Sequence, residues 1–116
     1  MSRLALPEGW ECEIPEGWLK FADEMWKELE ALLEEHGVES LQVYGLKEKY
    51  GEIRLDMDWF DFLEDWEDKW TDVSRETCVL CGEKAEFRTV GWIEPFCGEC
   101  FEKLKAKRPD LRYTRL

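Results

Sequence analysis

The chain has 116 residues, a formal net charge of −12, and 7 Trp, 6 Phe and 3 Tyr residues. The aromatic content predicts a packed protein and excludes a disordered one, and the length favours one compact domain. No apolar run reaches the roughly 18 residues of a membrane span, and the stretch MSRLALPEGW turns acidic too early for a signal peptide. We therefore expect a soluble, cytosolic protein.

The charge is unevenly distributed along the chain. Residues 1–77 carry 22 acidic and 8 basic side chains, a net charge of −14, whereas residues 78–116 carry 6 and 8, a net charge of +2. The negative field of the first part repels phosphate groups and speeds association with a basic surface. A coat of charge for solubility is the alternative explanation.

The tetrapeptide PEGW occurs twice, at residues 7–10 and 15–18. The first copy leads into the extended segment WECEI, where Cys12 alternates with apolar residues and is expected to be a buried side chain rather than a metal ligand or a reactive thiol. The second copy opens a helix, with Pro15 at its first position and Gly37 after its end. The apolar face of this helix consists of Trp18, Ala22, Met25, Leu29 and Leu33. The two copies are therefore interpreted as two separate turns and not as units of a repeat.

Residues 38–57, VESLQVYGLKEKYGEIRLDM, alternate apolar and polar side chains on both sides of Gly51. This pattern predicts two strands joined by a short loop. Ile53, Leu55 and Met57 are expected to face the core.

Residues 58–76, DWFDFLEDWEDKWTDVSRE, predict an amphipathic helix with two opposite stripes. The apolar stripe is Trp59, Leu63, Trp66, Trp70 and Val73. The acidic stripe is Asp61, Asp65, Asp68 and Asp72. Like charges at this spacing destabilise a helix by a few tenths of a kcal/mol each, and only Lys69 offsets them, so a solvated face explains the stripe poorly. Carboxylates about 6 Å apart over roughly 16 Å of helix resemble a run of phosphates, which predicts a binding site for a basic surface.

Four of the five cysteines form the pattern Cys78-x2-Cys81-x15-Cys97-x2-Cys100. Two CxxC pairs at this separation predict one structural zinc ion, because four thiolates leave no open position for a catalytic one. Two disulfides or a redox-active CxxC are the alternatives, and nothing in the sequence indicates the secretion that disulfides favour. Between the pairs, EFRTVGWIEPF predicts a hairpin, and FEKLKAK after Cys100 predicts a short helix.

No part of the sequence indicates an enzyme. His36, the only histidine, stands at a helix end and is interpreted as a partner of the helix dipole rather than a catalytic base. Carboxylates are too numerous to identify an acid–base pair. The last stretch, KLKAKRPDLRYTRL, carries six Lys and Arg residues against one Asp, so it either contacts nucleic acid or folds back on the acidic part.

Four stretches together resemble a group of small zinc-binding phage and prophage proteins: GW at 17–18, LQVYGLKEKYGEIRLDM at 41–57, SRETCVLCG at 74–82 and GWIEPFCGEC at 91–100. The chain departs from the group at Glu52, where a second Gly is expected, and in its Trp- and Asp-rich helix. Small acidic phage proteins of this kind include type II anti-CRISPRs, which this chain resembles. The resemblance implies a zinc-stabilised protein in the cytoplasm of a host bacterial cell that binds Cas9, whose nucleic acid lies in a positively charged channel, and prevents productive DNA engagement.

These observations predict a single α+β domain with an N-terminal helix, a β-hairpin, an acidic amphipathic helix and a C-terminal four-cysteine zinc ribbon or knuckle. Residues 1–77 form an acidic body, 78–106 a zinc-ribbon subdomain and 107–116 a basic tail. The expected function is inhibition by binding to a basic surface of a nucleic-acid-binding protein, without direct binding to duplex DNA, a membrane or a small-molecule substrate. The alternative is a zinc-ribbon nucleic-acid-binding or adaptor protein that uses the basic tail.

Overall fold

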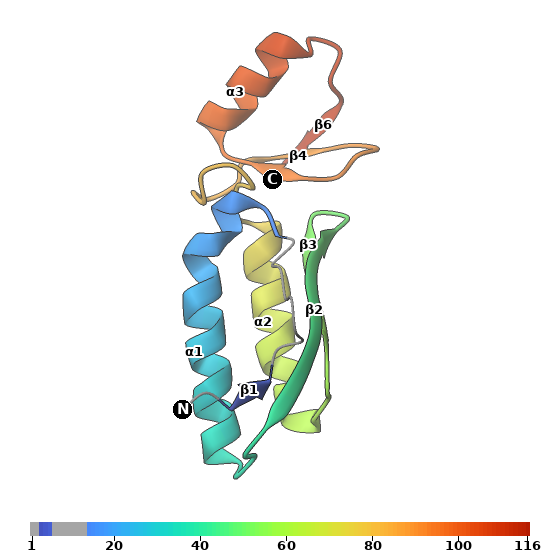
Figure 1. The fold of residues 1–116 in the computed structure, drawn as a ribbon. Helices are drawn as coiled ribbons and strands as arrows, with labels where there is room; N and C mark the ends of the chain where they lie inside the picture. The colour runs from blue at the N-terminus through green and yellow to red at the C-terminus, as the bar shows by residue number, and fades with distance from the viewer. Residues whose placement is uncertain (1–2, 6–13) are drawn as a thin grey trace.

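Two parts stacked end to end make up the computed structural model, which describes residues 3–5 and 14–116 and measures 51 × 28 × 21 Å (Figure 1). The body contains β1 (Leu4–Ala5), a 3-10 turn (Glu16–Trp18), α1 (Leu19–Glu35), β2 (Leu41–Lys49), β3 (Glu52–Met57), a second 3-10 turn (Asp61–Leu63) and α2 (Glu64–Arg75). The part after it, here called the C-terminal lobe, contains β4 (Phe87–Thr89), β5 (Pro95–Phe96), α3 (Gly98–Lys107) and β6 (Tyr113–Arg115). The α+β class is as predicted, while Cys12 lies outside the described residues.

The hydrophobic core runs from the body into the C-terminal lobe. Helices α1 and α2 lie beside the β2–β3 hairpin along the length of the body (Figure 1). Their buried side chains form one cluster with those of the sheet and of the cysteine-containing segment. Its fully buried members in the body include Trp18, Met25, Leu29, Leu33, Leu41, Val43 and Leu63. Each such side chain contributes about 1.5–3 kcal/mol by leaving water.

Helix α1 buries the predicted apolar face. Its start differs from the prediction, because Pro15 precedes a 3-10 turn and the α-helix begins only at Leu19. Its end is as predicted: Gly37 has a φ of +70°, and its N–H donates to the carbonyl of Glu34 at 3.1 Å. The N–H of Val38 donates to the carbonyl of Leu33 at 2.8 Å, which completes a Schellman cap.

Strands β2 and β3 form the predicted hairpin around a two-residue loop. Tyr50 and Gly51 have φ values of 56° and 76°, the type I′ geometry that matches the twist of a hairpin. Ile53 is 2% exposed, and Leu55 and Met57 are half-buried, as expected for the core side of β3. Strand β1 adds a short parallel pairing on the other edge of β2, with Leu4 opposite Leu41.

The acidic helix is shorter than predicted. Trp59, which we placed on its apolar stripe, precedes the helix and is 48% exposed, so this prediction is wrong. The chain stays extended there because the N–H of Asp58 donates to the carbonyl of Gln42 at 2.9 Å and prolongs the contact with β2. The rest of the stripe is as predicted: Leu63, Trp66 and Trp70 are buried, and Val73 is half-buried.

The C-terminal lobe is a three-stranded sheet, in the order β5-β4-β6, with α3 packed against it. The predicted hairpin is present, with Gly91 at φ +89° in its loop, and the predicted helix begins three residues earlier, at Gly98. The last residues do not extend freely, because β6 pairs with β4 and places Tyr113 opposite Thr89. Among the described residues, no helix has the length and apolar character needed to cross a membrane.

The body and the C-terminal lobe meet through close backbone contacts. The N–H of Gly17, from the second PEGW copy, donates to the carbonyl of Val79 at 2.9 Å. A Cβ on Gly17 would collide with the carbonyl of Cys78 and lie 2.8 Å from the nitrogen of Gly82. At the other side of the joint, a Cβ on Gly51 would lie 3.2 Å from Ile93. Small residues at both contacts therefore allow the two parts to approach.

Candidate functional site

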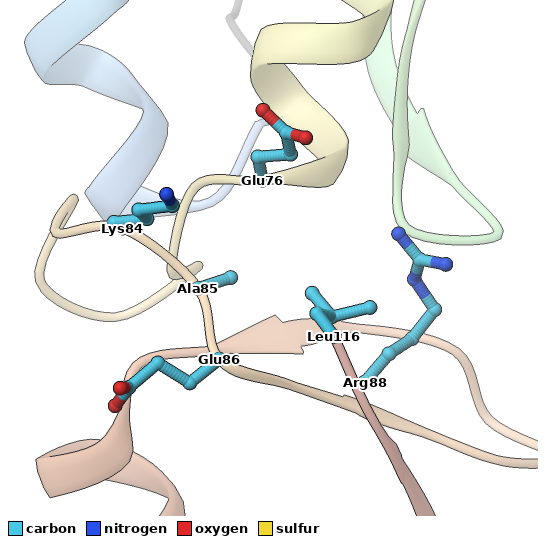
Figure 2. Close-up of a pocket in the computed structure, with 6 residues that line it drawn as sticks. All are labelled: Glu76, Lys84, Ala85, Glu86, Arg88 and Leu116. Carbon is cyan, nitrogen blue, oxygen red and sulfur yellow. The ribbon is translucent and has the colours of Figure 1, made fainter.

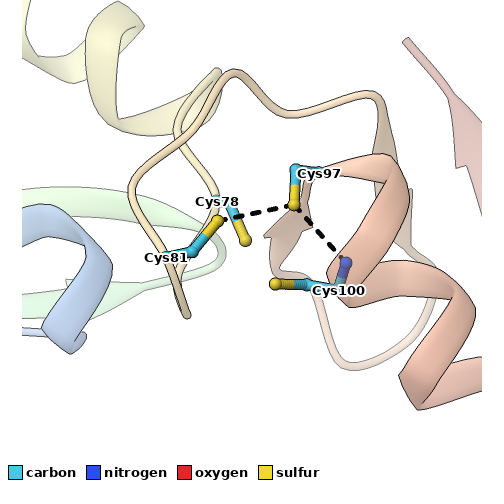
Figure 3. A group of neighbouring side chains, drawn as sticks. All are labelled: Cys78, Cys81, Cys97 and Cys100. Carbon is cyan, nitrogen blue, oxygen red and sulfur yellow. Dashed lines mark hydrogen bonds between the residues drawn. The ribbon is translucent and has the colours of Figure 1, made fainter.

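The four cysteines that the sequence singles out come together at the joint. Cys78 and Cys81 lie on the loop after α2, whereas Cys97 precedes α3 and Cys100 lies in its first turn. Their sulfur atoms are all within 4.8 Å of one another, and the side chains converge on one point (Figure 3). The group could therefore hold a metal ion, as the spacing predicts.

The sulfur positions fit a tetrahedral ion. A metal with bonds of about 2.3 Å to four sulfurs requires sulfurs about 3.8 Å apart. The Sγ atoms of Cys81 and Cys97 are 3.5 Å apart. The backbone N–H of Cys100 donates to the Sγ of Cys97 at 3.4 Å, a contact that stabilises a negatively charged sulfur (Figure 3).

The protonation of the cysteines supports the same assignment. Burial alone would raise the pKa of Cys78, but backbone N–H groups, first of all that of Cys97, lower it to about 7. Burial raises the pKa of Cys97 and of Cys100, and the hydrogen bonds that the Cys100 thiol donates to neighbouring sulfurs raise the pKa of Cys100 further. Four adjacent sulfurs therefore cannot all carry charge unless a cation lies among them, and a metal ion supplies it.

The four-cysteine group is held in place by the body as well as by its own loops. The indole N–H of Trp18 donates to the carbonyl of Thr77 at 3.0 Å, immediately before Cys78. Gly82 has a φ of +82°, so the loop after Cys81 turns there in a conformation that favours glycine. The sequence singled out the four cysteines, but apart from the repeated PEGW it gave no signal that Gly17 lies against the backbone of their first loop.

The predicted acidic stripe is exposed along its whole length. Asp65, Asp68 and Asp72 lie on α2, and Asp61 lies in the turn before it; all four are exposed. The apolar residues of the same helix point into the core, so the carboxylates lie on the side that faces solvent. We call this set of four aspartates the acidic face.

The acidic face has little compensating charge among the residues described. Lys69, the expected partner, instead pairs with Glu28 on α1 at 2.7 Å and lies over the ring of Trp70. Arg75 pairs with Glu52 and only distantly with Asp72, at 3.8 Å. Burial, followed by the charge of Asp68, also raises the pKa of Glu67 on the same helix.

A cavity of about 430 Å³ lies between the end of α2 and the sheet of the C-terminal lobe (Figure 2). Two carboxylates, two cations and two apolar side chains line it: Glu76, Glu86, Lys84, Arg88, Ala85 and Leu116. The sequence gave no indication of it, since the lining residues come from three separate segments. No histidine, serine or cysteine is among these lining residues.

No protein-family model, curated protein or solved structure that we compared with this chain matches it. The proposals that follow rest on its sequence and its geometry.

Glu94 makes the stability of the C-terminal lobe depend on pH. Burial, and secondarily the charge of Glu48, raises its pKa to about 7 from 4.5. The folded lobe is stabilised by the neutral carboxyl of Glu94, and this stabilisation is complete below pH 4.5. It is lost as the pH rises through about 7, because the buried carboxyl then becomes charged. We expect Glu94→Gln to raise the melting temperature of the metal-loaded protein more at about pH 8 than at about pH 6. A difference that does not change with pH would contradict this expectation.

Proposed function

We propose that this protein is a zinc-stabilised inhibitor that binds a nucleic-acid enzyme through its acidic face. The sequence resemblance makes Cas9, in the cytoplasm of a host bacterial cell, the first partner to test. The observation that carries the proposal is the acidic face: four exposed aspartates on one helix and the turn before it, with their expected counter-charge engaged elsewhere.

The spacing of the acidic face suits a surface that normally holds phosphates. Asp65, Asp68 and Asp72 recur at three and four residues, so adjacent carboxylates lie about 5–6 Å apart along α2. Enzymes that hold nucleic acid in a channel line it with positive charge. A helix with this spacing competes for such a channel because its carboxylates occupy the positions of backbone phosphates.

The helix that carries these charges is fixed to its neighbours. The indole N–H of Trp66 donates to the carbonyl of Met25 at 3.2 Å, which fixes α2 against α1. The buried hydroxyl of Ser74 accepts from the N–H of Ile53 at 3.0 Å and fixes the same helix to the hairpin. A helix whose backbone is already fixed loses little backbone entropy on binding, which favours affinity.

The metal centre has a structural role in this proposal. Four thiolates complete the tetrahedral shell that zinc prefers and leave no position for a substrate. Zinc supplies the positive charge that lets the buried cysteines ionise together. It thereby holds the loop after α2 to the start of α3.

Reversing two central charges tests the acidic face. Asp65→Lys with Asp68→Lys keeps Leu63, Trp66 and Trp70 in place and removes repulsion between the aspartates. It also puts a cation in the first turn of α2, which costs about 0.3–1 kcal/mol, so the melting temperature of the variant is measured first. We expect the concentration needed to inhibit Cas9 cleavage of a target plasmid to rise by about tenfold or more. Binding kinetics at two salt concentrations should show a slower association, because exposed charges act mainly on the on-rate.

The matched control is Asp23→Lys with Glu34→Lys, which makes the same change in net charge on exposed positions of α1. It should inhibit almost as well as the wild type. Equal inhibition by the wild type and the α2 variant would show that the acidic face is only solvated. Failure of the wild type to affect Cas9 would reject that partner.

A further inference from the structure

The C-terminal lobe carries a surface of opposite character to the acidic face. It combines exposed aromatic rings with cations from the end of α3 and from β6. Trp92 is 50% exposed and Tyr113 is 40% exposed. We call this surface the aromatic–basic patch, and it consists of Trp92, Lys105, Arg108, Tyr113 and Arg115.

Each ring of the patch has a cation beside it. The guanidinium of Arg108 lies 5.8 Å from the ring centre of Trp92, and the ammonium of Lys105 lies 5.1 Å from that of Tyr113. Lys105 and Arg108 are three residues apart at the end of α3, so they are neighbours on its surface and join the two ring–cation pairs. Arg115 extends the patch, since its guanidinium lies 5.7 Å from the ring of Phe87.

The rings are held in place by the fold. Tyr113 meets Phe101 of α3 edge-on at 4.7 Å and Phe87 of β4 at 5.7 Å. The loop that carries Trp92 is tied to the segment before β6 by the N–H of Val90, which donates to the carbonyl of Arg112 at 3.0 Å. An aromatic ring that is half exposed and packed on one side against the fold offers a flat face to a ligand. Such a ring loses little conformational entropy when the ligand binds.

The charge around the patch is positive although the whole chain is negative. Residues 103–116 carry six Lys and Arg residues and one Asp. The patch belongs to the C-terminal lobe, while the acidic face lies on the body of a molecule 51 Å long (Figure 1). Charges are largely screened beyond about 8 Å at physiological salt, so the acidic face does not cancel the local field of the patch.

We propose that the aromatic–basic patch binds single-stranded nucleic acid. Unpaired bases expose flat faces that stack on Trp92 and Tyr113, while the phosphates between them contact Lys105, Arg108 and Arg115. A duplex hides the faces of its bases, and so it gains only the contacts with phosphate. An acidic protein segment would use the cations and leave the exposed rings without a partner.

The test is fluorescence anisotropy of labelled oligo(dT), oligo(U) and a duplex of the same length, each mixed with the zinc-loaded full chain. We expect saturable binding of both single strands, at least tenfold tighter than that of the duplex, and the ratio between oligo(dT) and oligo(U) distinguishes a DNA from an RNA ligand. Raising the salt should weaken binding of all three probes, because phosphate contacts release counter-ions.

Variants separate stacking from charge. Trp92→Ala should weaken binding of the single strands about tenfold, whereas Trp92→Phe, which keeps a ring, should retain most of it. Lys105→Gln with Arg108→Gln should weaken all three probes and lower the salt dependence. The matched control, Lys27→Gln with Lys47→Gln on the body, makes the same charge change and should bind as the wild type does.

Four results would overturn the proposal. Three concern binding: no binding of single strands, a duplex bound equally well, or patch variants that bind as tightly as the control. The fourth is sedimentation of the protein alone as a dimer that the patch variants abolish, which would assign the patch to a second copy. No Cas9 is present in these experiments, so their outcome is independent of the proposed inhibition.

Discussion

Cys81→Ser will abolish metal binding and unfold the C-terminal lobe. A serine hydroxyl at this position stays protonated and removes one of four ligands that lie within 4.8 Å of one another. Structural zinc contributes on the order of 10 kcal/mol to the folding of a small domain, more than the sheet and one short helix of this lobe supply by themselves. We expect the purified variant to contain no zinc, whereas the wild type contains one ion per chain, and near-ultraviolet circular dichroism should show loss of tertiary structure.

Cys12→Ala is the control for this result. We expect it to retain full zinc content and to lose only packing energy, because the four-cysteine group is complete without it. Full zinc content and an unchanged melting curve in Cys81→Ser would reject the metal centre. Loss of zinc from the Cys12 variant would instead make that cysteine a ligand.

Gly17→Ala will weaken metal binding without changing any ligand. Its methyl group would collide with the carbonyl of Cys78 and lie 2.8 Å from the backbone of Val79 and of Gly82. These are backbone atoms of the cysteine loop, so relief requires that the loop moves away from the body. Overpacking of this kind costs about 1–3 kcal/mol. We expect a lower melting temperature and faster loss of zinc to a chelator.

Gly37→Ala is the matched control for Gly17→Ala. Gly37 has a φ of +70°, and a Cβ built on it meets nothing within 4 Å. This substitution carries backbone strain of about 1 kcal/mol and no collision, so it should lower stability slightly and leave zinc retention unchanged. Equal rates of zinc loss in the two variants would show that the contact of Gly17 with the loop has no influence on the metal.

Local sequence patterns predicted the elements whose structure is set by residues close together in the chain. Helical spacing identified the buried face of α1, and the Gly-containing loop located the β2–β3 hairpin, since turn type and register are set within a few residues. The four cysteines that come together were singled out for the same reason, because each CxxC pair forms its own tight loop.

The errors arise where distant segments decide the structure. Trp59 fits the helical period, but the hydrogen bond from Asp58 to β2 keeps that segment extended, and periodicity alone does not detect this competition. The predicted basic tail contains a strand, and local patterns did not reveal its partner because β4 lies more than twenty residues earlier. The same pairing assembles the aromatic–basic patch: the sequence indicated its basic residues, but not that Trp92 and Tyr113 lie beside them.

The contact between Gly17 and the cysteine loop has a consequence for the order in which the site is made. The N–H of Gly17 bonds to Val79, which lies between the first two cysteines. The first pair of cysteines lies on the loop that this contact holds to the body, whereas the second pair lies at the start of α3. Docking of the loop against the body can therefore place two of the four sulfurs before the second pair arrives. Binding of a metal ion then requires only that Cys97 and Cys100 reach Cys78 and Cys81, which are already in position.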